Sequence, residues 1–283
     1  MKKIVKKKTS SVKKSLPVNV VKKPKENVRM HVLAIGNVLA FIAVLVVNYL
    51  AVNLPIGGMT TWALSDLYPN LFTPAGLTFS IWGLIYLAVF GFVIWQVVDF
   101  YKRKSKEITV KIWIWFLLSC VANIGRIFAW HYTQLFLSVL IMIFFLAVLI
   151  VIANKVQLGK KLWKRTDKLL VQVPFSLYLW WICVATIANI STWLVHIQWA
   201  MRGMTPIFWT ILVIIVATLL ALLALYKKYN IIFALVVIRA FIGIIIKTLW
   251  AEVVYTQIIR TLGTCIAIIT AGIGATRQKR LKN

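Results

Sequence analysis

Residues 135–153 read LFLSVLIMIFFLAVLIVIA, and Ser138 is the only polar residue among them. A helix needs roughly 20 consecutive, mostly apolar residues to cross the hydrocarbon core of a bilayer, which is about 30 Å thick. This segment has about that length and contains no charged residue. It is therefore expected to form a membrane-spanning helix.

Similar runs recur along the whole chain. The 283 residues are 61% hydrophobic and 14% charged, whereas a soluble domain is roughly half apolar and about one quarter charged. A soluble fold of this length has no interior large enough to bury so much apolar side chain. We expect an all-α, polytopic membrane helix bundle. The expected spans are residues 31–53, 76–98, 112–131, 135–153, 169–194, 205–226, 231–247 and 256–275.

The distribution of basic residues predicts how these spans are oriented. Lys and Arg are enriched in the cytoplasmic loops of membrane proteins. In an eight-span arrangement, 28 of the 33 Lys and Arg residues fall in the two terminal tails and in three alternate connections, all on one side. Both termini are therefore expected in the cytoplasm. A seven-span alternative would place the C-terminal tail outside.

The basic residues also limit the range of partners. Residues 1–30 contain eleven Lys and Arg and are expected to be a disordered, solvated cytoplasmic tail that acts as a topology signal. Contact of this tail with anionic lipid head groups is the alternative. The tail is rich in Lys, whereas an organellar transit peptide is rich in Arg and Ser. We expect an integral protein of a bacterial plasma membrane, with membrane lipid as a partner. No nucleic-acid partner is expected, because the charge lies between apolar runs and not on the face of a soluble fold.

One polar stripe in the third span is informative about function. Asn123, Arg126 and Trp130 are spaced i, i+3 and i+7 and share one helix face. A guanidinium inside the membrane requires carbonyls, a carboxylate, water or an anionic ligand. The central parts of the expected spans contain no Asp or Glu. Two interpretations stay open, a salt bridge from Asp66 or Glu252 and a site for an anionic ligand.

Other polar residues within the spans have simpler interpretations. Asn37 and Asn48 lie three helical turns apart on one face of the first span. Hydrogen bonds to neighbouring helices are the favoured explanation, and contact with a ligand is the alternative. Arg239 in the seventh span either extends its side chain to the membrane surface or lines a water-filled cavity.

Two segments carry a recognisable motif. Residues 73–86 read TPAGLTFSIWGLIY, and residues 174–189 read PFSLYLWWICVATIAN. They resemble the TPPG…FGPVW…LY and PY…WxxFATxxN segments of the tryptophan-rich sensory protein (TspO/MBR) family, whose animal members are called translocator protein or peripheral benzodiazepine receptor. The third span, with Asn123 and Trp130 ahead of a very short turn, is similar to the third helix of that family.

The resemblance covers residues 31–195, the length of an ordinary family member. Ala75 stands where the family has a second proline, one residue is missing before Trp82, and Pro174 lies seven rather than four residues before Trp181. The remaining spans are expected to make this an extended member with a five-helix core. The expected organisation is a basic tail (1–30), a five-helix membrane domain (31–195), three additional transmembrane helices (196–276) and a basic tail (277–283).

The family resemblance implies a five-helix bundle with a pocket covered by the first loop. Family members bind tetrapyrroles such as protoporphyrin IX, cholesterol or benzodiazepine-type compounds, and many are homodimers. By resemblance, Trp181 and Ala185 line the pocket, as does Trp82 if the helix absorbs the missing residue.

The residues themselves point to the same place. The loop at 57–76, which has no basic residue, would cap a cavity whose flat aromatic walls suit a flat apolar ring, and Arg126 would bind its carboxylates. The alternative is that the tryptophans serve only in packing and as interface anchors. The expected ligand-binding residues are Trp82, Tyr86, Asn123, Arg126, Trp130, Trp181, Ala185 and Asn189.

The leading functional hypothesis is a membrane-embedded binder or sensor of a hydrophobic small-molecule ligand that carries carboxylates, such as protoporphyrin IX or a haem-like tetrapyrrole. No cofactor is required. One alternative is an anion transporter that uses Arg126, Arg239 and Arg260. A second is the light-dependent porphyrin breakdown linked to some bacterial family members. The chain contains no paired carboxylates, phosphate-binding loop, catalytic triad spacing or Cys/His metal cluster, so an enzyme is the less favoured class.

Overall fold

The computed structural model describes residues 24–54, 56–101, 107–158, 165–199, 203, 205–228 and 230–282, and its regular elements within these ranges are all helices. Eight of these helices are long and apolar enough to cross a membrane. The predicted all-α membrane helix bundle is thus confirmed, and the eight candidate helices agree with the favoured eight-span arrangement rather than with the seven-span alternative. Most of the predicted N-terminal tail, residues 1–23, lies outside the described residues.

The spanning helices form two groups along the chain. The first group comprises α1 (Pro24–Asn53), α3 (Ile81–Tyr101), α4 (Glu107–His131), α5 (Leu135–Lys155) and α7 (Val173–His196). The second comprises α8 (Pro206–Lys228), α9 (Ile231–Leu249) and α10 (Thr256–Lys282). The short elements are η1 (Ile56–Gly58), α2 (Thr61–Asp66) and η2 (Gly76–Ser80) between α1 and α3, and α6 (Arg165–Asp167) and η3 (Lys168–Gln172) before α7.

Two helices extend into the predicted terminal tails. α1 begins at Pro24, inside the predicted tail, and α10 continues to Lys282 through most of the second basic tail. Helix propagation costs little once an apolar span has nucleated it. Proline suits the first helical position, and Arg, Gln and Lys are good helix formers. Hydropathy detects where the chain leaves the hydrocarbon and not where the helix ends.

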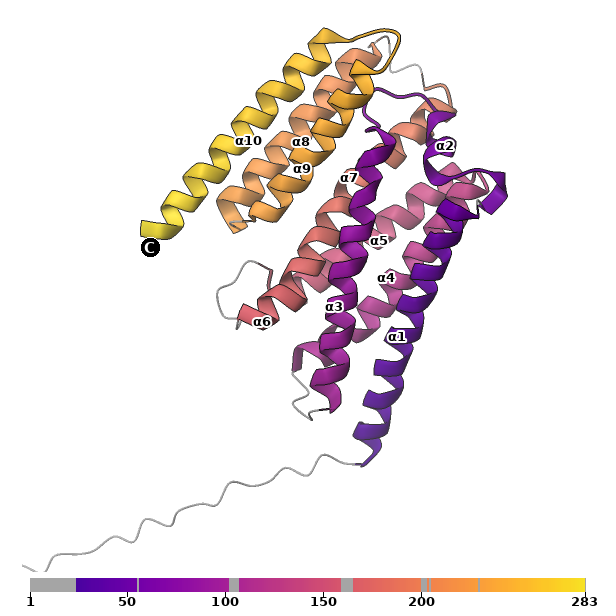
Figure 1. Ribbon diagram of the computed structural model, residues 1–283, viewed down its shortest axis with the longest axis vertical. Coiled ribbons are helices and arrows are strands. Elements are labelled where there is room, and N and C mark those ends of the chain that lie inside the picture. Colours follow the sequence, from indigo (N-terminus) through magenta and orange to yellow (C-terminus); the bar gives the residue numbers. More distant parts are fainter. Residues whose placement is uncertain are drawn as a thin grey trace, which may run out of the picture.

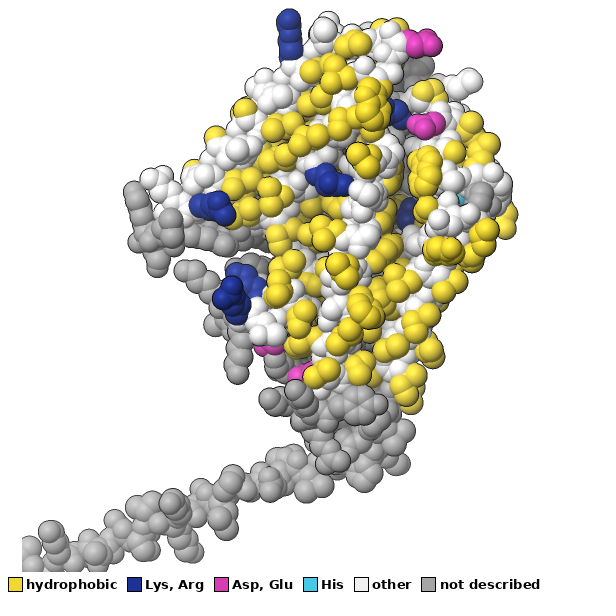
Figure 2. Space-filling model, viewed as in Figure 1, with side chains coloured by type: hydrophobic (Ala, Val, Ile, Leu, Met, Phe, Trp, Pro, Cys, Tyr) yellow, Lys and Arg dark blue, Asp and Glu magenta, His cyan; other side chains and the backbone are white. Residues whose placement is uncertain are grey.

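The two groups pack around a shared interface. α4 packs against α1 and α5, α5 packs against α7, and α3 crosses α7. α8, α9 and α10 pack against one another and meet the first group through α9, which lies against α7 (Figure 1). Side chains on the outer surface are mostly hydrophobic, interrupted by a few Lys and Arg (Figure 2). Such a surface suits contact with lipid acyl chains.

The ends of the bundle differ in what they carry. The start of α1 lies at the lower end of the helices in Figure 1, and α2 lies in their upper part. The helix ends next to the basic connections are at the end opposite α2, as the alternation of spans requires. The assignment of that end to the cytoplasm stays a prediction.

Four helices of the first group meet at a buried asparagine. Asn123 of α4 is completely buried, and its Nδ2 donates to Tyr178 Oη of α7 at 2.7 Å and to Tyr86 Oη of α3 at 3.2 Å. Its Oδ1 accepts from Asn48 Nδ2 of α1 at 2.8 Å. Asn37 Nδ2 in turn donates to Gln96 Oε1 of α3 at 3.5 Å. The expectation that both asparagines of the first span bond to neighbouring helices is confirmed.

Replacing Asn123 should weaken the bundle measurably. Asn123→Leu removes three hydrogen bonds, each worth about 0.6 kcal/mol in a membrane protein interior, so we expect a loss of roughly 2 kcal/mol of stability. The measurement is the melting temperature in a mild detergent. Asn37→Leu is the matched control, because Asn37 makes one long bond and its Oδ1 has no partner. Equal losses in the two variants would show that Asn123 has no special role.

Candidate ligand-binding site

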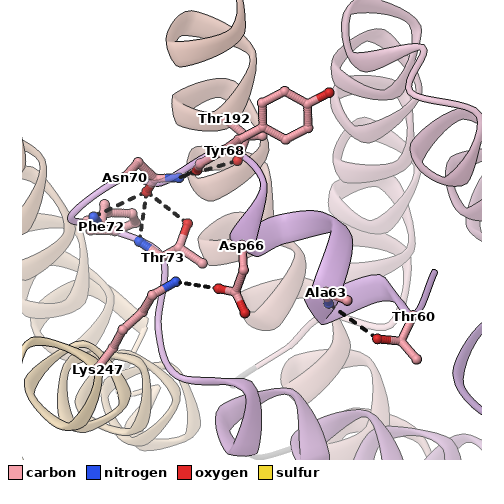
Figure 3. Close-up of polar contacts among 9 residues, drawn as sticks. All are labelled: Thr60, Ala63, Asp66, Tyr68, Asn70, Phe72, Thr73, Thr192 and Lys247. Atoms are coloured by element: carbon pink, nitrogen blue, oxygen red, sulfur yellow. Dashed lines mark hydrogen bonds and ion pairs between the residues drawn. The ribbon is translucent and has the colours of Figure 1, made fainter. Parts of the chain in front are cut away.

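The loop between α1 and α3, residues 56–80, folds over the end of the helix bundle and is called the lid below. Thr60 Oγ1 caps α2 by accepting from the backbone N–H of Ala63 at 3.2 Å. Asn70 Oδ1 accepts from the backbone N–H groups of Phe72 at 3.2 Å and Thr73 at 2.8 Å (Figure 3). It also accepts from the Thr73 hydroxyl at 2.8 Å. These bonds give the lid a defined shape of its own.

The start of the lid is fixed to the end of α4. His131 Nδ1 lies 2.7 Å from the carbonyl oxygen of Ile56, and because a carbonyl only accepts, Nδ1 carries the hydrogen. Its Nε2 lies 3.0 Å from Thr61 Oγ1, and Trp130 Nε1 donates to Thr61 O at 3.3 Å. Gly57 has φ +68°, and a Cβ there would lie 2.9 Å from the His131 oxygen. Only glycine permits this approach.

The middle of the lid rests on α7. Asn70 Nδ2 donates to Tyr68 O at 3.3 Å and lies 3.4 Å from Thr192 Oγ1 (Figure 3). The ring of Tyr68 meets the ring of His196 edge to face at 5.5 Å. The lid is thereby placed over the gap between α4 and α7.

Two adjoining cavities lie under the lid. The first, the lid chamber, has a volume of about 60 Å³. Its wall includes Ser65 and Thr73 of the lid and Trp130, Trp181, Ala185 and Asn189 of α4 and α7. The second, the α1–α3 cleft, has a volume of about 450 Å³. Its wall includes Asn48 and Tyr49 of α1, Trp62 and Gly76 of the lid, and Gly83 and Tyr86 of α3.

The two cavities differ in volume. Small-molecule sites typically have volumes of roughly 300–1,000 Å³. The cleft falls within this range at about 450 Å³, whereas the chamber at about 60 Å³ is far below it. The cavities share Thr61, Phe79, Trp82 and Arg126 as wall residues. A molecule with a large ring body therefore fits the cleft and can direct a small polar group towards the chamber.

Arg126 lies on the wall between the two cavities and is 8% exposed. Its guanidinium carbon lies 5.2 Å from the centre of the Trp82 ring, a cation–π contact. Among the described residues it forms no salt bridge. Asp66 instead pairs with Lys247 at 2.9 Å, and Glu252 is exposed. The salt bridge from Asp66 or Glu252 to Arg126, one of the two interpretations left open by the sequence, is therefore wrong.

Three buried polar atoms of the chamber wall have no hydrogen-bond partner among the described residues: Arg126 Nε, Trp181 Nε1 and Asn189 Oδ1. A buried polar atom without a partner costs about 1–3 kcal/mol. Asn189 is otherwise bonded, since its Nδ2 donates to Ser138 Oγ of α5 at 3.0 Å. Two unused donors and one unused acceptor around one cavity are what a small polar group or water would satisfy.

Aromatic rings form the rest of the shared wall. Trp82 stacks on Tyr86 with a centroid distance of 5.3 Å and meets Trp181 edge to face at 6.2 Å. Phe79 of the lid meets Trp181 edge to face, also at 6.2 Å. These flat faces hold the indole of Trp82 between the cleft and the chamber.

The structure brings the sequence-predicted residues together. Trp82, Arg126, Trp130, Trp181, Ala185 and Asn189 line the chamber, and Trp82, Tyr86 and Arg126 line the cleft. Asn123 lines neither cavity and holds Tyr86 in place. The sequence did not single out Thr61, Ser65 and Phe79 as wall residues, although they lie in or beside the predicted covering loop.

Two observations concern the alternative functions. Arg239 and Arg260 line neither the chamber nor the cleft, so these cavities do not join the three arginines into one path. In the part of the chain that the structure describes, no group of three or more His, Cys, Asp or Glu side chains is arranged to hold a metal ion.

Comparison with known proteins identifies the family of this chain. Residues 34–275 match the family described as TSPO-like protein. No curated protein and no solved structure matches the chain. The family match begins in α1 and ends in α10, so it continues past residue 195, where the motif resemblance stops, and includes the three C-terminal spans. With its eight apolar helices, this chain is an integral membrane protein that belongs to the TSPO-like protein family.

Proposed function

We propose that this TspO-type membrane protein binds an apolar, carboxylate-bearing ligand, with the ring body in the α1–α3 cleft and the anionic group on Arg126. The observation that carries the proposal is the buried guanidinium of Arg126, which borders both cavities and has no acidic partner among the described residues. An arginine within a membrane span disfavours insertion by about 2.5–3.5 kcal/mol at the helix centre. A ligand carboxylate would compensate with charge-assisted hydrogen bonds.

The shape of the cleft supports a flat ring system. Its volume of about 450 Å³ matches a small-molecule site, and the stacked rings of Trp82 and Tyr86 offer a flat apolar wall. The residues Tyr49 and Trp62 of the cleft wall are exposed at the surface of the protein. An apolar ligand dissolved in the bilayer would reach the cleft from the side. A tetrapyrrole with carboxylates, such as protoporphyrin IX, has this combination of properties.

Arg126→Gln should weaken binding of a carboxylate ligand selectively. Hydrogen bonds to a charged group contribute about 1.5–3 kcal/mol, so we expect the Kd for protoporphyrin IX to rise about ten- to hundred-fold. Its dimethyl ester keeps the ring and lacks the charges, so its Kd should hardly change. Quenching of tryptophan fluorescence in detergent measures both ligands.

Arg260→Gln is the matched control, because Arg260 lies within a span, is exposed and borders neither cavity. It should leave both Kd values unchanged. The proposal would be refuted if Arg126→Gln bound the diacid as tightly as the parent protein, or if it weakened diacid and diester equally.

A second prediction distinguishes the two cavities. Gly83→Leu places a side chain in the cleft, where no atom lies within 4 Å of a Cβ built at Gly83. It should raise the Kd for protoporphyrin IX at least about tenfold by excluding the ring. Ala185→Val narrows only the chamber and should have a small effect. If Ala185→Val instead raised the Kd for protoporphyrin IX more than Gly83→Leu did, and both variants kept the melting temperature of the parent protein, the ring body would lie in the chamber.

A further inference from the structure

One face of α9 contacts the lid at three successive turns. Arg239, Gly243 and Lys247 are four residues apart and therefore lie on the same side of the helix. Arg239 Nη2 donates to Ser80 Oγ at 2.8 Å, and Lys247 Nζ donates to Asp66 Oδ1 at 2.9 Å (Figure 3). Between them, the carbonyl oxygen of Gly243 accepts from the backbone N–H of Ala75 at 3.0 Å.

Gly243 sets how closely the lid approaches α9. A Cβ at this position would meet Thr78 Oγ1 and would lie 2.9 Å from Pro74 Cβ. Real Cβ atoms do not approach that closely, so any side chain at residue 243 pushes the lid away from α9. Pro74 and Thr78 flank Ala75, whose N–H makes the bond to α9. The backbone hydrogen bond between Ala75 and Gly243 therefore depends on the absence of a side chain at residue 243.

The contacted segment is the part of the lid that covers both cavities. Thr73 and Pro74 belong to the wall of the chamber, and Gly76 and Ser80 belong to the wall of the cleft. Asp66 ends the helix α2, whose Ser65 also lines the chamber. A displacement of residues 66–80 from α9 would consequently open both cavities at once.

We infer that α9 is a clasp for the lid, in which Arg239, Gly243 and Lys247 hold residues 66–80 closed and thereby set the rate at which the site beneath opens. This inference gives the C-terminal helices a role in the proposed ligand-binding function and rests on it for its ligand readout. The three residues are positioning residues, because none of them lines the chamber or the cleft.

The three contacts should differ in strength. The side chains of Lys247 and Asp66 are 32% and 65% exposed, so solvent and lipid head groups screen their ion pair. The Gly243 contact is buried and combines a backbone hydrogen bond with close packing. Its disruption should therefore open the lid more than loss of the ion pair does.

Opening can be measured without a ligand. Ser65 is on the side of the lid that lines the chamber and is 6% exposed, so a Ser65→Cys probe should react slowly with a charged, water-soluble maleimide in detergent. The parent chain with Ser65 gives the background from Cys120, Cys183 and Cys265, which lie within the spans. The labelling rate then reports how often the lid opens.

The expected order of labelling follows from the contacts. Gly243→Ala should raise the labelling rate of the probe about tenfold or more, since it overpacks the clasp. Lys247→Gln should raise it about two- to five-fold. Gly263→Ala is the matched control, because a Cβ at Gly263 of α10 has no atom within 4 Å, and it should change nothing.

Charge exchange tests the ion pair and guards against misfolding. The double variant Asp66→Lys with Lys247→Asp should return the labelling rate to that of the parent, whereas each single reversal should exceed Lys247→Gln. Unchanged labelling in both Gly243→Ala and Lys247→Gln would overturn the clasp. If the double variant does not restore slow labelling, the Asp66–Lys247 ion pair is not part of the clasp.

The ligand readout separates the clasp from the proposed function. Faster dissociation of protoporphyrin IX from Gly243→Ala and Lys247→Gln, measured by recovery of tryptophan fluorescence, would support both. Faster labelling in a chain that binds no porphyrin would support the clasp and refute the proposed function. Faster dissociation without faster labelling would refute the clasp alone.

Discussion

Hydrocarbon offers no hydrogen-bond partners, so each polar side chain buried in the bundle must find one in the protein. Asn123 meets this requirement by bonding at once to α1, α3 and α7, and in doing so it fixes their positions around α4. Arg126 is one turn further along the same face. Since the helices around it are already fixed by Asn123, its guanidinium faces Trp82 at 5.2 Å and remains between two cavities. The geometry of the site thus follows from a structural hydrogen-bond network just below it.

The lid is under a related constraint, because polar backbone groups that an irregular segment buries against the bundle also need hydrogen-bond partners. It finds these partners internally through Asn70 and externally on α4, α7 and α9. Helices α8 to α10 are packed against the first five spans, because α9 contacts α7 and also the loop that covers the two cavities. The family match, which includes these helices, is consistent with this packing.

Much of the fold could be predicted from the sequence, since a span is a local property of about 20 residues. The stripe of Asn123, Arg126 and Trp130 was also visible, because helical spacing is fixed. The residues that these side chains contact on other helices could not be predicted from the sequence. Asp66 pairs with Lys247, which lies 181 residues away, and nothing in either local sequence distinguishes this pairing from one with Arg126. The division of the site into a narrow chamber and a wider cleft depends on side-chain packing. Likewise, Gly243 looks like any helical glycine until the lid is placed against it.

Arg239 and Arg126 both lie within spans but differ in burial, and this difference separates an arginine with a structural contact from one that is a candidate for ligand binding. Arg239 is exposed on α9, and Ser80 of the lid gives it a hydrogen-bond partner. Arg126 is buried, faces an aromatic ring, and has an Nε without a partner. A buried charge that the protein itself leaves without an acidic partner is stable only if something else supplies counter-charge or solvation. Composition treats the two arginines alike, but of the two it is Arg126 that is buried with a nitrogen left unpaired among the described residues.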